Sequence, residues 1–258
     1  MSSPPILPED PWHSLRAFTT ARIAQGRAGG SLPTRPMLAF ELARARARDA
    51  VQLPFDMLTL TAAAPPGVDC LHVHSAAPSR DSYLQRPDLG RRLDSPSRAR
   101  LEAHASAVAR PDFVFVIADG LSAFAAHQHA VSVFTLAADA LRTAGWRIAP
   151  LILAKFARVA LGDEIGEVLG AEQVAILIGE RPGLSAVDSL GIYLTYAARP
   201  GRTDAERNCI SNIHPDGGLS YAQAAHKLVW LGHEARKRQQ TGVLLKDESD
   251  SCPRLLGG

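Results

Sequence analysis

The sequence of 258 residues has too few cysteines and too little net charge to belong to several common classes of protein. Its three cysteines, Cys70, Cys209 and Cys252, are widely separated, which fits neither a disulfide framework nor a Cys-x-x-Cys metal site. The 28 basic and 26 acidic residues give a formal net charge of +2, without the basic excess of a nucleic-acid-binding protein. We therefore expect a reducing, cytoplasmic location and no nucleic acid partner.

Long apolar runs and a cleavable leader are also missing. No uninterrupted apolar run approaches the ~20 residues that a membrane-spanning helix needs. The first residues, MSSPPILPEDPWHSL, contain neither the basic nor the apolar region of a signal peptide. Because 46% of the residues are hydrophobic, the chain has enough apolar side chains for a sizeable core. We expect a soluble globular protein that is not exported by a cleaved signal and does not bind membranes.

The signatures of several common ligand and catalytic sites are absent from the sequence. It contains no Gly-x-Gly and no Gly-Lys dipeptide, which argues against a nicotinamide site and a Walker A loop. It also contains no Gly-x-Ser-x-Gly elbow and no His-Glu-x-x-His zinc motif. If the chain binds a cofactor, it must do so in another way.

From Pro111 onwards, short apolar runs with β-branched and aromatic members predict strands that are buried on both faces. The runs are residues 113–120, 148–154, 174–179 and 191–197. Helical patterns separate the first three of them. Because strands and helices alternate, we expect an α/β domain with a parallel sheet and right-handed crossovers over residues 110–258.

Residues 1–109 are expected to form a mainly helical N-terminal domain. Two helices fit within residues 12–48, and a further helix begins from an Asp94 or Ser95 cap. A short strand at residues 70–75 is the one exception that the pattern suggests.

Polar residues at the ends of the predicted strands are the first candidates for function. In open parallel sheets, ligands bind beyond the carboxyl ends of the strands. Asp119 and the pair Glu180 and Arg181 follow two such strands. Two alternatives stay open: Asp119 caps the next helix, and Glu180 and Arg181 form a solvated ion pair.

Two pairs of histidines are spaced two residues apart, His72 with His74 and His127 with His129. Metal binding needs further ligands, and the sequence identifies none. We therefore expect exposed or hydrogen-bonded histidines and no metal site.

Residues 207–218, RNCISNIHPDGG, predict a turn-rich loop ahead of a final helix that begins at Ser220. A nucleophilic Cys209 would need a lowered pKa, and His214 is near it only in sequence. We expect a packed, unreactive thiol at Cys209, and no catalytic residue in this chain.

Six short segments of the chain resemble one known family. They are RIAQGRAG, YLQRPDLGRRL, IADGLSA, IGEVLGA, GERPGL and NCISNIHP, in order between Arg22 and Pro215. The family is the small subunit of adenosylcobalamin-dependent ethanolamine ammonia-lyase. The resemblance implies a mainly helical N-terminal part followed by a Rossmann-like α/β domain. It also implies a complex with a separate large subunit, whose barrel holds the substrate, and a cobalamin that lies between the two subunits. Such a complex converts ethanolamine to acetaldehyde and ammonia.

The resemblance also implies three cofactor contacts, at Val159 of FARVALGDEIGE, Glu180 of GERPG and Cys209 of NCIS. An apolar side chain such as Val159 suits a corrin ring, and an acceptor such as Glu180 suits its amide or ribose donors. No histidine has an aspartate two residues before it, so the Asp-x-His-x-x-Gly loop of other cobalamin enzymes is absent. We therefore expect the nucleotide base of the cofactor to stay on cobalt.

Members of the family that enter bacterial microcompartments carry a longer N-terminal amphipathic leader. The start of this chain is short and proline-rich, so we expect a cytoplasmic enzyme, with the microcompartment as the alternative. A second function also stays open, that of an independent small-molecule-binding or regulatory module on a Rossmann-like sheet.

Overall fold

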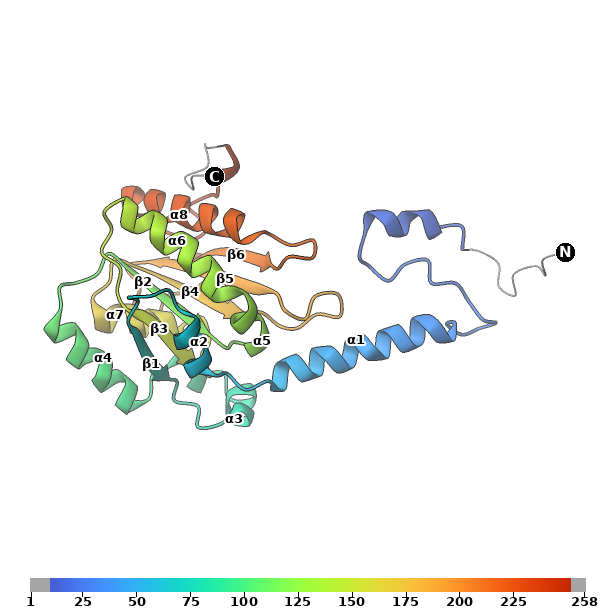
Figure 1. Ribbon diagram of the computed structural model, residues 1–258, viewed down its shortest axis with the longest axis horizontal. Helices are drawn as coiled ribbons and strands as arrows, with labels where there is room; N and C mark the ends of the chain where they lie inside the picture. The colour runs from blue at the N-terminus through green and yellow to red at the C-terminus, as the bar shows by residue number, and fades with distance from the viewer. Residues whose placement is uncertain (1–9, 252–258) are drawn as a thin grey trace.

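The computed structural model describes residues 10–251, and a six-stranded sheet forms its centre (Figure 1). The strands lie in the order β1-β3-β2-β4-β5-β6. Their bounds are Cys70–His74 for β1, Phe113–Ala118 for β2, Leu151–Lys155 for β3, Gln173–Gly179 for β4, Leu190–Tyr196 for β5 and Asn208–Ile213 for β6. The fold is α/β, and strands β2 and β4 at its centre are buried on both faces.

The expectation of a parallel sheet is correct for four strands and wrong for the last two. Strands β1, β3, β2 and β4 are parallel, whereas β5 runs antiparallel to β4 and β6 antiparallel to β5. Only residues 180–189 connect β4 to β5, and they contain no helix. A parallel neighbour needs a longer crossover connection, so the short link makes β5 antiparallel.

Strand β6 occupies half of the segment that the sequence predicted to be a turn-rich loop. Ile210 and Ile213 are buried, whereas Cys209, Ser211 and Asn212 are exposed. The predicted burial of Cys209 is therefore wrong, because its side chain lies on the solvent side of an edge strand.

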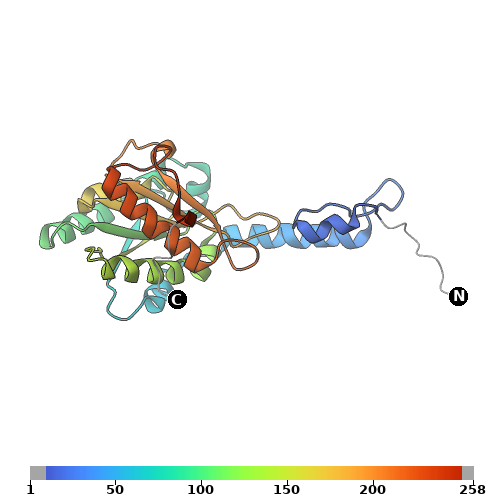
Figure 2. The ribbon, with the colours of Figure 1, turned by 90° about the horizontal axis from the view of Figure 1, so that it is seen from above.

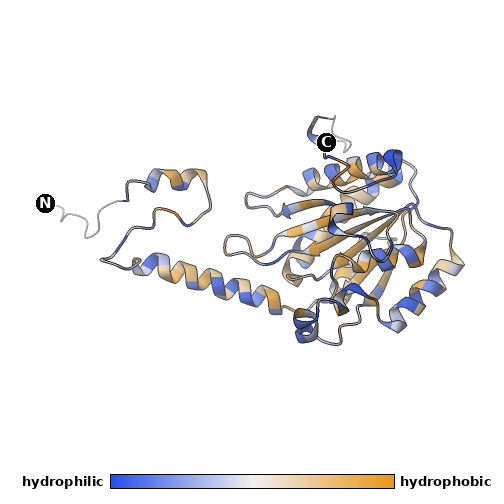
Figure 3. Ribbon diagram, turned by 180° about the vertical axis from the view of Figure 1, so that it is seen from behind, coloured by the Kyte–Doolittle hydropathy of each residue, from blue (hydrophilic) through white to orange (hydrophobic). Residues whose placement is uncertain are grey.

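Helices cover both faces of the sheet, with α6 and α8 on one face and α4 and α7 on the other (Figure 1). The α-helices are Thr34–Gln52 (α1), Met57–Ala63 (α2), Arg80–Gln85 (α3), Ser95–Ala107 (α4), Ala123–Ala125 (α5), Val131–Thr143 (α6), Leu161–Leu169 (α7) and Tyr221–Arg238 (α8). Short 3₁₀ turns lie at His13–Phe18 (η1), Leu89–Arg91 (η2), Asp204–Glu206 (η4) and Ser249–Ser251 (η5), and a π-helical turn, η3, at Ala126–Ala130. Figure 3 shows the apolar strands between these two layers.

Two predicted helix starts are confirmed. Asp94 caps α4 and accepts a hydrogen bond from the backbone N–H of Ser97 at 2.8 Å. Ser220 caps α8, and Gln223 completes a capping box there.

Strand β1 lies in the half of the chain that was expected to be mainly helical. It pairs with β3 along its whole length, and α4 packs against α7. Residues 70–107 therefore share one sheet and one core with the second half. The boundary between residues 109 and 110 stays a prediction.

Residues 10–52 form an arm that projects from the sheet and its helices (Figures 1 and 2). In α1 only Ala50 is buried. Trp12, Phe18 and Leu38 are 64%, 85% and 60% exposed, respectively. Among the helices of residues 10–251, none combines the length and the apolar character needed to cross a lipid bilayer.

Candidate functional site

A cavity of about 410 Å³ lies at the carboxyl ends of β2, β3 and β4. The loops that follow the three strands supply most of its wall, and α3 and β5 supply one residue each. The lining residues are Tyr83, Gly120, Leu121, Arg158, Val159, Ile178, Gly179, Glu180, Arg181 and Tyr193. The cavity therefore lies at the edge of the sheet where the sequence predicted ligand binding.

Glycines allow the ends of β2 and β4 to approach closely at the base of this cavity. Gly120 has a φ of +55°, and the Leu121 N–H donates to the Gly179 carbonyl at 3.0 Å. A Cβ atom at Gly179 would lie 1.9 Å from the Ser122 carbonyl oxygen. Side chains at these positions would push the two loops apart, so the shape of the cavity depends on the glycines.

Asp119 lies buried next to the cavity and joins two of its loops. Its carboxylate accepts hydrogen bonds from the backbone N–H groups of Gly120 and Ala157, each at 3.0 Å, and pairs with Arg80 at 3.2 Å. Desolvation raises the pKa of Asp119 to about 6. Ser122, and not Asp119, caps the following helix α5. Asp119 thus positions the loop after β3 and does not line the cavity.

Glu180 lines the cavity and is held by a neighbour on the opposite side of its loop. The Ser189 hydroxyl donates to Glu180 Oε2 at 2.5 Å, and the Glu180 N–H donates to the Ser189 carbonyl at 3.0 Å. Within residues 10–251, Glu180 forms no ion pair with Arg181. The alternative of a solvated Glu180–Arg181 pair is therefore not what the structure shows.

Val159 lines the same cavity, and Cys209 lies just beyond it. Cys209 is opposite Tyr193, a lining residue, in the register of β5 and β6. Desolvation raises the pKa of the Cys209 thiol, the charge of Glu180 raises it further, and a hydrogen bond with Tyr193 lowers it. A raised pKa favours the protonated form of the thiol, which is free and exposed.

Three lining residues with polar side chains were not singled out in the sequence: Tyr83, Arg158 and Tyr193. Arg158 stands directly before Val159 in the loop after β3, and its guanidinium group lies 4.2 Å from the Tyr83 ring centre. Ligands in open parallel sheets bind beyond the carboxyl ends of the strands, and the sequence analysis applied this rule to β2 and β4. Applied to β3 as well, the rule would have indicated Arg158. Tyr83 comes from α3, and its local sequence gives no such signal.

Three of the four paired histidines form side-chain hydrogen bonds within the protein. His127 Nε2 accepts from the Asp56 N–H at 3.0 Å, and His72 Nε2 lies 2.8 Å from the Thr61 hydroxyl. His129 lies 2.7 Å from the Tyr221 hydroxyl. Across the part of the chain that the structure describes, no group of three or more His, Cys, Asp or Glu side chains is arranged to hold a metal ion.

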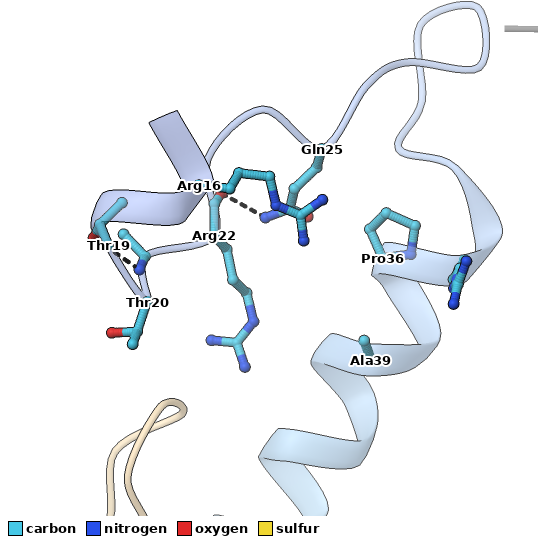
Figure 4. Close-up of a pocket in the computed structure, with 9 residues that line it drawn as sticks. Arg16, Thr19, Thr20, Arg22, Gln25, Pro36 and Ala39 are labelled. Atoms are coloured by element: carbon cyan, nitrogen blue, oxygen red, sulfur yellow. Dashed lines mark hydrogen bonds between the residues drawn. The ribbon is translucent and has the colours of Figure 1, made fainter. Parts of the chain in front are cut away.

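A larger cavity, of about 580 Å³, lies within the arm, between the segment around η1 and α1 (Figure 4). Its charged lining residues are Arg16, Arg22 and Arg35, and Figure 4 shows Gln25 donating to the Arg22 carbonyl. All of its lining residues fall within residues 16–39, most of them are exposed, and none belongs to the sheet. We assign the ligand site to the smaller cavity because that cavity gathers residues from the ends of three strands.

The strand-end cavity suits one part of a large amphipathic cofactor such as a cobalamin. Val159, Leu121 and Ile178 offer apolar contact, and Glu180 offers an acceptor. The guanidinium group of Arg158, which also lines the cavity, offers hydrogen-bond donors. A volume of about 410 Å³ is typical for a drug-sized molecule and holds only part of a corrin with its side chains.

Comparison with known proteins gives one consistent result. The family model described as "Ethanolamine ammonia-lyase light chain (EutC)" matches residues 9–246. The chain is 56% identical to the ethanolamine ammonia-lyase small subunit of Ralstonia nicotianae over 258 residues, which covers 99% of this chain and 95% of that one. It is 53% identical to the Pseudomonas fluorescens small subunit, over 96% and 91% of the two chains. Identity to the Azotobacter vinelandii small subunit is 54%, over 94% and 90%.

Proposed function

The chain belongs to the family of ethanolamine ammonia-lyase light chains, and we propose that it covers adenosylcobalamin at an interface with a separate large subunit. The complex converts ethanolamine to acetaldehyde and ammonia, and the large subunit holds the ethanolamine. When bound, the cofactor supplies the radical chemistry of the reaction. The residues of this chain bind and orient the cofactor and exclude water from one side of it.

The observation that carries this proposal is the meeting of Val159 and Glu180 in one cavity at the strand ends. These residues are 21 positions apart in sequence and follow different strands, β3 and β4. In the proposed site, Val159 contacts the apolar corrin, and Glu180 accepts a hydrogen bond from an amide or hydroxyl group of the cofactor. Cys209, across from Tyr193, packs at the edge of the site.

The partner subunit is proposed to cover the open side of the cavity and the arm together. Residues 181–188 extend from the cavity to the arm, where Arg22 donates to the Leu184 carbonyl at 2.8 Å. Apolar side chains of the arm are exposed next to this contact, among them Phe40 and Leu42. Because the two surfaces are continuous, one large partner can bury both.

Reconstitution with the large subunit tests the proposal. The purified chain alone should release no ammonia from ethanolamine and bind adenosylcobalamin weakly, because it offers one wall of a shared site. Mixing with the large subunit should give a stable complex, tight cofactor binding and turnover. Ammonia release by the chain alone, or cofactor binding by the large subunit that this chain does not change, would contradict the proposal.

A further inference from the structure

Two arginines in the wall of the strand-end cavity have no acidic partner. Arg158 and Arg181 both line the cavity, and neither forms an ion pair within residues 10–251. Elsewhere, arginines that are buried or half-buried do pair with carboxylates. Examples are Arg80, Arg202, Arg207 and Arg236. The cavity therefore holds two guanidinium groups whose charge the chain itself leaves without a direct partner.

The guanidinium group of Arg158 is held in place before any ligand arrives. Its Nη2 donates to the Tyr83 carbonyl at 3.2 Å, and its Cζ lies 4.2 Å from the centre of the Tyr83 ring. The Arg158 N–H donates to the Gly90 carbonyl at 2.8 Å, which fixes the backbone as well. Little conformational entropy would be lost when such a side chain binds a ligand.

The Nε atom of this ordered guanidinium group is buried and lacks an acceptor among the described residues. A buried donor without an acceptor is unfavourable, and most such groups in proteins have a partner. Because this atom has almost no exposed surface, a ligand in the cavity would meet the other nitrogens of the guanidinium group. Charge favours an anion, because guanidinium groups bind phosphate and carboxylate oxygens with strong, charge-assisted hydrogen bonds.

Glu180 restricts where an anion can lie. It lines the same cavity, and its carboxylate would repel a ligand placed against it. Ser189 already donates to Glu180. The anionic part of the ligand must therefore lie on the Tyr83 and Arg158 side, with neutral donors of the ligand near Glu180.

We propose that Arg158, assisted by Arg181, binds the phosphodiester in the nucleotide tail of the cofactor. This inference rests on the proposed function. Adenosylcobalamin carries its adenosyl group on one face of the corrin and its nucleotide tail on the other. The adenosyl face must point to ethanolamine in the large subunit, so the tail faces this chain. The phosphodiester is the anionic group of that tail.

Comparison of two corrinoids in the reconstituted complex tests this assignment. Adenosylcobalamin has the phosphodiester, whereas adenosylcobinamide lacks the whole nucleotide tail. Affinities of both are measured by spectroscopic titration, without substrate, for wild type, Arg158→Gln and Arg181→Gln. The matched control is Arg199→Gln. Arg199 is an exposed arginine that follows β5, and because β5 runs antiparallel to β4, it lies at the amino end of β4, away from the cavity.

Arg158→Gln should weaken adenosylcobalamin binding about ten- to a hundredfold and leave adenosylcobinamide binding within about threefold. Arg181→Gln should change adenosylcobalamin binding in the same direction by about three- to tenfold, and the control should change neither. Arg181 is exposed and has no packing role, so this variant tests the proposal even if Arg158→Gln does not fold.

Equal weakening of both corrinoids would show that Arg158 supports the cavity wall and does not bind the phosphodiester. Unchanged affinity for both would also overturn the inference, and inorganic phosphate bound through Arg158 in that case would identify a free-phosphate site. Failure of the wild-type complex to bind either corrinoid would instead contradict the proposed function. The two failures are therefore distinguishable.

Discussion

Glu180 gives the most direct test at the scale of a single residue. A hydrogen bond to a charged group contributes roughly 1.5–3 kcal/mol, so Glu180→Ala should weaken adenosylcobalamin binding about ten- to a hundredfold. Glu180→Gln should weaken it less, because its carbonyl oxygen can still accept. Titration of the cofactor into the reconstituted complex measures both effects.

The control for Glu180 is the residue whose hydroxyl hydrogen-bonds to it, Ser189. Ser189→Ala removes the hydroxyl that donates to Glu180 but keeps the carboxylate. Its effect on affinity should be smaller than that of Glu180→Ala. Unchanged affinity in Glu180→Ala, with the complex intact, would mean that the carboxylate does not contact the cofactor.

Because of Asp119, the free energy of unfolding should decrease as the pH rises through the native pKa of this group. Its carboxyl group has a pKa of about 6 in the native chain, against an ordinary value of 3.8. Between these values the native state holds a proton that the unfolded state has lost. The stabilisation that protonated Asp119 provides is complete below the unfolded pKa and is lost as the pH rises through the native pKa.

The comparison with Asp119→Asn isolates this effect, because the variant does not titrate at this position. From about pH 4 to pH 7, the free energy of unfolding of wild type should fall by up to about 3 kcal/mol relative to the variant. Urea unfolding at several pH values measures the difference. Parallel pH profiles would show that the native pKa of Asp119 is not raised.

At the scale of elements, one buried ion pair connects α7 to the start of β6. Arg207 and Asp163 form two hydrogen bonds, of 2.5 and 2.6 Å, and each side chain is 2% exposed. Removal of one partner leaves the other charge buried without compensation. Asp163→Ala or Arg207→Met alone should therefore lower the free energy of unfolding by about 3–5 kcal/mol.

The double variant should be less destabilised than the sum of the two single variants, because it leaves no unpaired charge. The control is the exposed pair of Arg142 and Asp139 on α6, where Arg142→Met should cost about 0–1 kcal/mol. Chemical unfolding gives all four values. Additive single effects would show that the two side chains do not stabilise each other.

Local signals in the sequence predicted elements well and their arrangement less well. The apolar runs that became β2, β3, β4 and β5 are confirmed as strands, because each is long enough to be recognised without its neighbours. The direction of β5 depends on the length of its connection to β4. Strand β6 was missed because asparagine and serine interrupt its apolar residues, and only Ile210 and Ile213 are buried.

The candidate site was predictable where it follows the ends of the strands. Glu180 was expected there from its position, and the structure brings it into one cavity with Val159. Tyr83 comes from α3, in a different part of the chain, and its ring stacks on Arg158. Such a long-range contact depends on tertiary packing, which no local pattern encodes.

At the scale of the whole molecule, the arm exposes large apolar side chains that a partner subunit could bury. Phe18 and Leu38 are 85% and 60% exposed. If the large subunit buries them, Phe18→Ser and Leu38→Ser should each weaken assembly about tenfold or more, since buried apolar anchors contribute on the order of 1–4 kcal/mol to binding. Sedimentation or surface-binding measurements with the large subunit give the affinity.

Val243→Ser is the matched control for the arm variants. Val243 is also highly exposed, at 73%, but its N–H bonds to Ala205 near the start of β6, away from the arm. This variant should assemble normally. Normal assembly of both arm variants would mean that the large subunit does not cover the arm.

The strand order β1-β3-β2-β4 also constrains how the chain is made on the ribosome. Strand β1 hydrogen-bonds only to β3, and β2 lies between β3 and β4. No two strands of the sheet can therefore pair until residue 155, the end of β3, has left the exit tunnel. Until then the nascent chain carries an unpaired β1 and an exposed apolar arm, both prone to aggregation. A partner that binds the arm at that stage would cover its apolar side chains.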